Sequence, residues 1–279
     1  MNRILPGTRD KYEALKAYID RFDSVAVAFS GGVDSSLLGK TCFDVLGSRS
    51  LAITLASPLL PQKELEDARM TASRIGIRHI QIEQKKLDGR IRENSAERCY
   101  FCKNSIFRLI IEEAQKQGID TVFDGSNADD CYDYRPGLKA LKELRVGSPL
   151  QQVGLNKAEI RELSRIKGLN TSNKPAYACL ASRIAYNEEI TAEKLEQIEK
   201  AERFLHSLGF VELRVRKHGP IARLEIAPEE REKLFYTKKM NTIAKELKSF
   251  GFLYVCMELE GYASGSLNRQ LDQPCQTKN

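Results

Sequence analysis

The chain contains 279 residues, of which 42% are hydrophobic and 29% are charged, a composition that supplies a buried core and excludes a disordered chain. Lysine and arginine outnumber aspartate and glutamate by 44 to 38, an excess that suits phosphate-bearing ligands but falls short of a nucleic-acid-binding signature. Nothing near Met1 resembles a signal peptide, and no run approaches the roughly 18 consecutive apolar residues that a membrane helix needs. We therefore expect a cytoplasmic protein without a membrane partner.

Strands and helices are predicted to alternate through the first two thirds of the chain. Tyr12, Leu15, Ile19 and Phe22 recur at helical spacing and predict an amphipathic first helix. Apolar, β-branched runs predict strands at 24–29, 51–55, 77–82 and 121–125, separated by helices near 34–46, 62–75 and 102–117. This order indicates an α/β domain, residues 1–188, with a parallel sheet covered on both faces.

The pattern changes beyond about residue 188. We expect a helix at 191–208, strands at 211–217 and 221–226, a helix at 229–248 and a last strand in FLYVCMEL, residues 252–259. These elements predict a smaller α+β domain, residues 189–279, for substrate binding or oligomerisation. The tail after Gly261 is polar and irregular.

The run VAVAFSGGVDSSLL, residues 25–38, places small and polar residues where a buried strand turns into a helix. Glycines let the backbone approach a ligand, and the amides and dipole of a helix N-terminus attract phosphate. The run lacks both the GxxxxGK(S/T) and the GxGxxG spacings. It resembles the SGGxDS loop of the PP-loop ATP pyrophosphatases, which implies an ATP site formed by Ser30, Gly31, Gly32, Asp34, Ser35 and Ser36. A simple helix cap would use similar residues, but six matching positions favour the ATP site.

Seven cysteines in a chain without a secretory signal favour metal or sulfur chemistry over disulfides. Cys99 and Cys102 form a CxxC at the expected start of a helix, and Cys179 lies in a distant loop. Three thiolates suit an iron–sulfur cluster with one open iron, although zinc, a redox CxxC or unrelated buried thiols would use the same residues. The three histidines are far apart in the sequence, which argues against a histidine-built metal site. The other cysteines are expected to be core or surface thiols: Cys42, Cys131, Cys256 and Cys275.

Further blocks resemble the LarE family of ATP-dependent sulfur transferases: DGSNADDCYDYRPGLKA (124–140), GLNKAEIREL (154–163), KPAYACLASR (174–183) and LRVRKHGPIARLE (213–225). The resemblance extends from Ser30 to Glu225. It implies adenylation of a carboxylate of a pyridinium mononucleotide with ATP and Mg2+, and its conversion to a thiocarboxylate. The product would serve the biosynthesis of the nickel-pincer cofactor of lactate racemase. The family also implies a homo-hexamer.

The resemblance assigns roles to residues by position. Arg214 and Arg216 fall where the family binds the substrate phosphate, and Ser182 and Arg183 match its active-site pair. Glu202 and Glu225 match two acidic positions of the family. These carboxylates would hold a divalent ion or pair with these arginines. A further acidic position of the family is occupied here by Lys233.

One departure from the family decides the expected sulfur source. Some members sacrifice the sulfur of a cysteine at the position of Ala178, so that route is not expected here. Another branch binds a 4Fe-4S cluster through a CxxC and one loop cysteine, a pattern matched by Cys99, Cys102 and Cys179. This match implies that sulfide carried by the cluster, and refilled by a sulfide donor, reaches the adenylated carboxylate.

Three other functions use parts of the same pattern. A tRNA thiolase combines an SGGxDS loop with three cysteines but would need a broad basic, aromatic surface for RNA. A PP-loop amidotransfer ligase would leave the cysteines without a role. A zinc-stabilised nucleotide-binding module would contain zinc and release no pyrophosphate.

Overall fold

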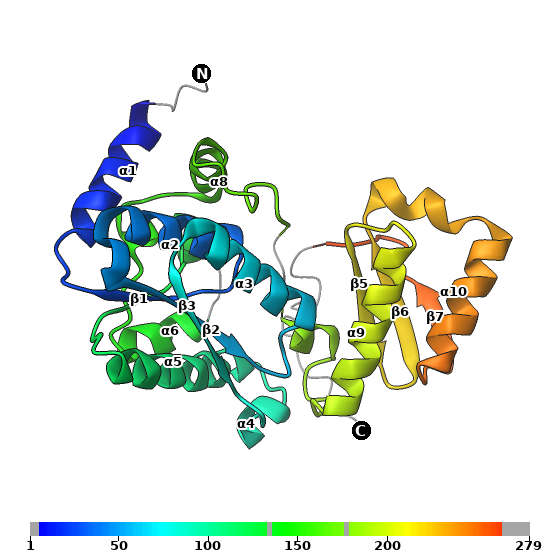
Figure 1. Cartoon of the computed structure of the whole chain (residues 1–279). Helices are drawn as coiled ribbons and strands as arrows, with labels where there is room; N and C mark the ends of the chain where they lie inside the picture. Colours follow the sequence, from blue (N-terminus) through cyan, green and yellow to red (C-terminus); the bar gives the residue numbers. More distant parts are fainter. Residues whose placement is uncertain (1–5, 133–135, 176–178, 264–279) are drawn as a thin grey trace. The chain divides into compact units, whose positions relative to one another are not determined.

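The computed structural model describes residues 6–132, 136–175 and 179–263 (Figure 1). The chain divides into two compact units. The first unit comprises residues 1–88 and 99–177, and the second comprises residues 89–98 and 178–279. The segment 89–98 is therefore an insertion that packs with the C-terminal part of the chain.

This division differs from the expected boundary at residue 188. Residues 179–188 pack with the second unit, because the Asn94 side-chain amide donates hydrogen bonds to the carbonyls of Ala185, at 2.7 Å, and Glu188, at 3.1 Å. The Asn187 amide donates in return to the Asn94 carbonyl at 3.0 Å. These bonds join two segments that lie about 90 residues apart in the sequence, which no local pattern predicts.

The first unit contains most of the helices. Its described elements are α1 (Pro6–Ile19), β1 (Val25–Ala28), α2 (Val33–Leu46), η1 (Gly47–Arg49), β2 (Ser50–Ala56), α3 (Gln62–Ile75), β3 (Arg78–Glu83), α5 (Arg98–Lys116, whose first residue belongs to the second unit), β4 (Val122–Phe123), η2 (Ala128–Tyr132), α6 (Pro136–Glu143), α7 (Pro149–Gln152) and α8 (Lys157–Ile166). The expected first helix, all four strands and the intervening helices are confirmed, with shifts of a few residues at their ends.

A four-stranded parallel sheet in the order β3-β2-β1-β4 forms the centre of the first unit (Figure 1). Successive residues of a strand point to opposite faces. Val25 and Val27 accordingly join the core formed with α1, α2, α3 and α8, whereas Ala26 joins the core formed with α5 and α6. The seven residues of β2 are all buried, as expected of a strand covered on both faces.

The second unit contains the short helix α4 (Gly89–Arg92) and the C-terminal elements. These are η3 (Leu180–Arg183), α9 (Ala192–Ser207), β5 (Leu213–His218), β6 (Ile221–Ile226), η4 (Pro228–Leu234), α10 (Thr237–Ser249) and β7 (Tyr254–Met257). The three strands form one sheet in the order β5-β6-β7, with β5 antiparallel and β7 parallel to β6. One face of this sheet packs its apolar residues with α9 and α10. The opposite face carries the arginines of β5 and β6.

The helix predicted over residues 229–248 is wrong in its first turns. The structure has the 3-10 turn η4 there, and α10 begins only at Thr237, after Tyr236 in an extended conformation. The cause is the buried carboxylate of Glu230, which accepts hydrogen bonds from the amides of Val211 and Glu212, each at 2.9 Å. This attachment to the loop before β5 bends the chain away from a single continuous helix.

None of the helices within the described residues is long and apolar enough to cross a membrane.

Glutamine in place of Glu230 should lower the melting temperature at neutral pH. Burial alone would raise the pKa of Glu230, but hydrogen bonds from Lys233 and from the amides of Glu212 and Val211 lower it below the usual glutamate value. A carboxylate with a lowered folded-state pKa stabilises the fold above its unfolded pKa of about 4.3, and this contribution disappears as the pH falls through the folded-state pKa. The difference in melting temperature between Glu230→Gln and the wild type should therefore shrink as the pH falls below about 4.3 and through the folded-state pKa of Glu230. A difference independent of pH would contradict the assignment.

Candidate functional site

The predicted ATP loop lies at the carboxyl end of β1 and opens directly into α2. Gly32 is the N-cap of α2, and no side chain caps the helix there. The amides of the first helical turn have no partners within the helix. Together with the helix dipole, they form a site for an anion such as a phosphate group.

The two glycines of the loop have different roles. Gly31 has a φ of +68°, and a Cβ atom there would lie 2.6 Å from the Cα atom of Ala68 in α3. Gly31 is therefore required for close packing against α3, a role that the sequence did not indicate. At Gly32 a Cβ atom would meet only the Ser30 hydroxyl, at 3.3 Å, so Gly32 leaves the approach to the amides open.

Serine hydroxyls hold the loop in shape. The Ser35 hydroxyl accepts from the Ser30 amide at 3.3 Å and lies 3.1 Å from the Ser30 hydroxyl, which in turn accepts from the Gly32 amide at 3.3 Å. Ser36 is fully buried, and its hydroxyl has no hydrogen-bond partner among the described residues. The loop is thus preformed, with Ser30 as its exposed member.

The structure adds residues that the sequence reasoning did not assign. The Asp34 carboxylate accepts from the Lys157 ammonium and from the Asn127 side-chain amide. A Cβ atom at Gly125 would lie 3.1 Å from the Ser35 amide nitrogen, so the chain after β4 packs directly against the ATP loop. The sequence contained a sign of this contact. The residues DGSN follow β4, and the carboxyl ends of neighbouring parallel strands meet at one edge of a sheet.

Asp124 is a second carboxylate at this edge and, unlike Asp34, it is buried. It accepts hydrogen bonds from the hydroxyls of Ser126 and Ser148, each at 2.5 Å, and lies 3.8 Å from the Lys103 ammonium. Lys103 follows Cys102 in α5, so the helix that bears the CxxC also contributes a cation beside the chain that packs on the ATP loop.

The three predicted cluster cysteines lie on two segments. Cys99 and Cys102 lie in the first turns of α5, where a spacing of three places them on one helix face. Cys179 is exposed and immediately precedes η3 in the second unit. Among the described residues, no three histidine, cysteine, aspartate or glutamate side chains are grouped so as to hold a metal ion. The cluster stays a prediction, and Ala178 lies outside the described residues.

Two of the remaining cysteines have defined surroundings. Cys42 is fully buried, and burial raises the pKa of its thiol far above the usual value, as expected of a core thiol. Cys256 is exposed on β7. The Cys131 side chain and all of Cys275 lie outside the described part of the structure.

A buried ion pair links three elements of the second unit. Arg183, at the end of η3, is fully buried and donates from Nε to Glu202 Oε1 at 2.9 Å and from its Nη2 to Oε2 at 3.2 Å. Glu202 is a residue of α9, and its Oε1 also accepts from the Val215 amide of β5 at 3.0 Å. This carboxylate therefore fixes η3, α9 and β5 together.

The arginines of the sheet continue this network. Arg216 donates to the Ser182 carbonyl and, at 2.8 Å, to Glu225. Arg223 donates to Glu225 at 2.7 Å and to Glu258 at 3.1 Å. The fold thus brings together the predicted residues Ser182, Arg183, Glu202, Arg216 and Glu225, and it adds Arg223 and Glu258, which were not predicted.

Arg214 lies at the edge of the same face. It is opposite Glu225 in the β5–β6 register, and its guanidinium lies 4.9 Å from the ring centroid of Tyr262. Arg214 and Arg216 share one face of β5, as the alternation of the strand predicts.

The predicted acidic residues Glu202 and Glu225 are engaged by arginines. Of the two roles that the sequence left open for them, the structure displays ion pairing, and metal binding by these carboxylates stays a prediction. Lys233, at the position where the family is acidic, pairs with Glu230 at 2.6 Å.

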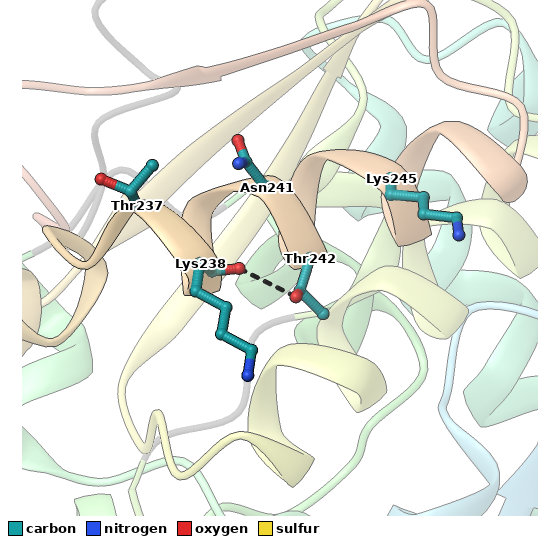
Figure 2. A pocket seen from close by; sticks show the side chains of 5 residues that line it. All are labelled: Thr237, Lys238, Asn241, Thr242 and Lys245. Atoms are coloured by element: carbon teal, nitrogen blue, oxygen red, sulfur yellow. Dashed lines mark hydrogen bonds between the residues drawn. The ribbon is translucent and has the colours of Figure 1, made fainter.

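A hollow on α10 lies apart from these residues (Figure 2). Its lining consists of Thr237, Lys238, Asn241, Thr242 and Lys245, and the Thr242 hydroxyl donates to the Lys238 carbonyl at 2.9 Å. All five residues lie on the exposed side of one helix, and none of the predicted site residues is among them. We assign no function to this hollow.

Comparison with known proteins places these observations in a family. A family model described as NAD synthase matches residues 8–104, which include the ATP loop. An uncharacterized protein of Synechocystis sp. is 42% identical over 262 residues, covering 94% of this chain and 98% of that protein. The pyridinium-3,5-bisthiocarboxylic acid mononucleotide synthase of Lactiplantibacillus plantarum is 35% identical over 268 residues, covering 94% of this chain and 95% of that enzyme. The tRNA-specific 2-thiouridylase of Rickettsia peacockii is 25% identical over 193 residues, covering 56% of this chain and 53% of that enzyme.

A parallel sheet that ends in an SGGxDS loop defines the class of PP-loop enzymes that use ATP. Within this class the chain belongs to the LarE family, because its similarity to the Lactiplantibacillus synthase extends over nearly the whole of both proteins. It is an ATP-dependent sulfur transferase, and the resemblance drawn from the sequence is confirmed.

Alanine at each loop glycine should separate folding from nucleotide binding. Gly31→Ala should destabilise the first unit by at least about 1–3 kcal/mol, since it adds backbone strain and a contact with the α3 backbone. Gly32→Ala should keep the stability of the wild type but lose the thermal stabilisation that ATP provides. Thermal unfolding with and without ATP measures both effects. Equal destabilisation by the two substitutions would contradict the different roles of the glycines.

Alanine at Glu202 should destabilise the second unit by about 3–5 kcal/mol, because Arg183 then loses its buried carboxylate. Glu196, on the same helix, pairs with Lys200 at 2.6 Å but is 65% exposed. Glu196→Ala is therefore the matched control, and it should cost about 1 kcal/mol or less. Chemical unfolding measures the loss of unfolding free energy in each variant. Similar losses for both variants would show that the buried Arg183–Glu202 pair stabilises the fold no more than the exposed pair does.

Proposed function

We propose that this chain adenylates a carboxylate of pyridinium-3,5-biscarboxylic acid mononucleotide and converts it to a thiocarboxylate. The observation that carries the proposal is the similarity, over 94% of the chain, to a synthase whose name specifies the bisthiocarboxylic acid product. The preformed ATP loop and the arginine face of the second sheet support it. We place the reaction in the biosynthesis of the nickel-pincer cofactor.

The first unit supplies the activation step. The amides at the start of α2 bind phosphate oxygens of ATP, and Mg2+ bound with ATP neutralises the pyrophosphate as it leaves. A substrate carboxylate oxygen then bonds to the α phosphorus as the bond to pyrophosphate breaks. Lys157 neutralises Asp34 at the side of the loop, which removes one source of repulsion for the triphosphate.

The second unit supplies the binding site for the mononucleotide phosphate. Four arginines of its network face three glutamates, so the network has a net positive charge: Arg183, Arg214, Arg216 and Arg223 against Glu202, Glu225 and Glu258. Arginine forks bind phosphate through paired, charge-assisted hydrogen bonds. Because Arg214 and Arg216 share one face of β5, a phosphate on that face would meet both side chains.

The sulfur source is assigned to the thiols of Cys99, Cys102 and Cys179. Their donor set fits a 4Fe-4S cluster, because thiolates are the ligands of such clusters and three of them leave one iron open. When bound, this cluster would supply the sulfide for the adenylated carboxylate. Alanine at position 178 leaves no cysteine for a sacrificial route. A sulfide donor and a homo-hexameric assembly complete the proposal.

The test is a reaction with defined acceptors under anaerobic conditions. Reconstituted protein is given ATP, Mg2+, sulfide and the pyridinium mononucleotide, and pyrophosphate and the sulfur-containing product are quantified. We expect both to form with this acceptor and not with tRNA or with ammonia as the nucleophile. Thiolation of tRNA instead would favour the 2-thiouridylase alternative, and zinc without pyrophosphate release would favour a binding module.

Serine variants test the sulfur source in the same assay. Cys179→Ser should retain pyrophosphate release but lose thiocarboxylate formation and cluster iron. Cys256→Ser is the matched control, since Cys256 is also exposed in the second unit, and it should retain all three. Retention of iron and product by Cys179→Ser would overturn the assignment.

A further inference from the structure

Phe29 is the residue at which the chain leaves the four-stranded sheet. β1 ends at Ala28, and Phe29 immediately precedes the ATP loop. The Phe29 amide still donates to the Ile53 carbonyl of β2 at 2.8 Å, as in a parallel ladder. The Phe29 carbonyl accepts instead from the side-chain hydroxyl of Thr54 at 2.5 Å. A side chain of β2 therefore ends the β1–β2 ladder one residue before Ser30.

The Thr54 hydroxyl is buried and has a single proton to donate. Thr54 is 2% exposed, and its hydroxyl also lies 2.8 Å from the Nε2 atom of His79 in β3. Because the hydroxyl proton is used on the Phe29 carbonyl, the proton of this second hydrogen bond belongs to Nε2. Burial and the positive charge of Arg69 lower the pKa of His79, which favours the neutral ring. Neutral His79 with its proton on Nε2 thus fixes the rotation of the hydroxyl toward Phe29.

The ring of Phe29 is fixed as well. A Cβ atom at Gly39 of α2 would lie 3.1 Å from its Cε2 atom, so the ring packs directly on the helix whose first turn offers the phosphate-binding amides. The His79 ring meets the same ring at 64°, with the two centroids 6.1 Å apart. Phe29 therefore joins β2, β3 and α2 at the entry to the ATP loop, and all of these elements belong to the first unit.

We propose that Thr54 and His79 are positioning residues for the ATP loop. Through the Phe29 carbonyl they set the direction in which the chain leaves β1, and therefore the direction of the amides at the start of α2. The inference rests on the proposed function, which assigns this loop to ATP. The two residues act through the backbone of Phe29 and not through a contact with the nucleotide.

The test is the affinity for MgATP, measured by isothermal titration calorimetry on the full-length protein. Thr54→Val keeps the shape of the side chain but removes the hydroxyl, so the Phe29 carbonyl loses its donor. The dissociation constant for MgATP should rise by about tenfold, the effect of one lost hydrogen bond. Thr54→Ser keeps the hydroxyl and should bind MgATP as the wild type does.

Thr41→Val is the matched control. Thr41 is fully buried in α2, and its hydroxyl also donates to a backbone carbonyl, that of Leu37, at 2.8 Å. The substitution removes the same chemical group from the same unit, but about two helical turns beyond the start of α2. The affinity of Thr41→Val for MgATP should therefore equal that of the wild type. Melting temperatures without nucleotide show which variants are folded at the temperature of the titration.

His79→Phe tests the second residue and carries the test where Thr54→Val does not fold. It keeps a ring beside Phe29 but removes the Nε2 proton, so the Thr54 hydroxyl is no longer held in one rotation. The dissociation constant for MgATP should rise by about threefold, less than in Thr54→Val because the hydroxyl itself remains. Wild-type affinity in His79→Phe would overturn the role of His79.

The outcomes separate the two proposals. A wild-type protein that does not bind MgATP would overturn the assignment of the loop, and the positioning role with it. Wild-type affinity in Thr54→Val would overturn the positioning role of Thr54 and leave the ATP site intact. Weakening in Thr54→Ser as large as in Thr54→Val would show that the hydroxyl is not the group that matters. Equal weakening in Thr41→Val would mean that any buried hydroxyl of this unit has the same effect, which also overturns the specific role.

Discussion

The second unit depends on the buried hydrogen bonds that the Glu202 carboxylate accepts. Its Oε1 accepts from both the Arg183 guanidinium and the Val215 amide, so one buried group joins η3, α9 and β5. A buried carboxylate is costly unless it is paired and fully hydrogen-bonded, and here an arginine fork and a backbone amide satisfy it. Arg183 also donates to the Cys179 carbonyl. The orientation of the backbone at Cys179 therefore depends on the same Glu202 carboxylate.

The two units present different kinds of hydrogen-bond donors. The first offers backbone amides at a helix N-terminus, a group that suits a phosphate without bringing a full positive charge. The second offers arginines, three of which glutamates already hold in place: Arg183, Arg216 and Arg223. Gly31 shows how closely the loop after β1 depends on packing, since its missing Cβ makes room for α3.

Periodicity predicted the parallel sheet, the first helix and the α+β nature of the second unit, because burial on one or both faces determines these patterns. It could not predict that residues 89–98 pack with residues 179–190, since that contact depends on single side chains such as Asn94. Nor could it predict the break before α10, which the buried Glu230 imposes. Family resemblance named Ser182, Arg183 and Glu202, but only the structure shows them as one network, with Arg223 and Glu258 added.

The central claim is that a substrate carboxylate becomes joined to AMP before sulfur replaces its oxygen. The most direct measurement is the fate of heavy oxygen placed in the carboxylates of the pyridinium mononucleotide. If the carboxylate attacks the α phosphorus and sulfide then displaces AMP, one labelled oxygen must appear in each AMP released, in proportion to the thiocarboxylate formed. Thiocarboxylate formed together with unlabelled AMP would contradict the account.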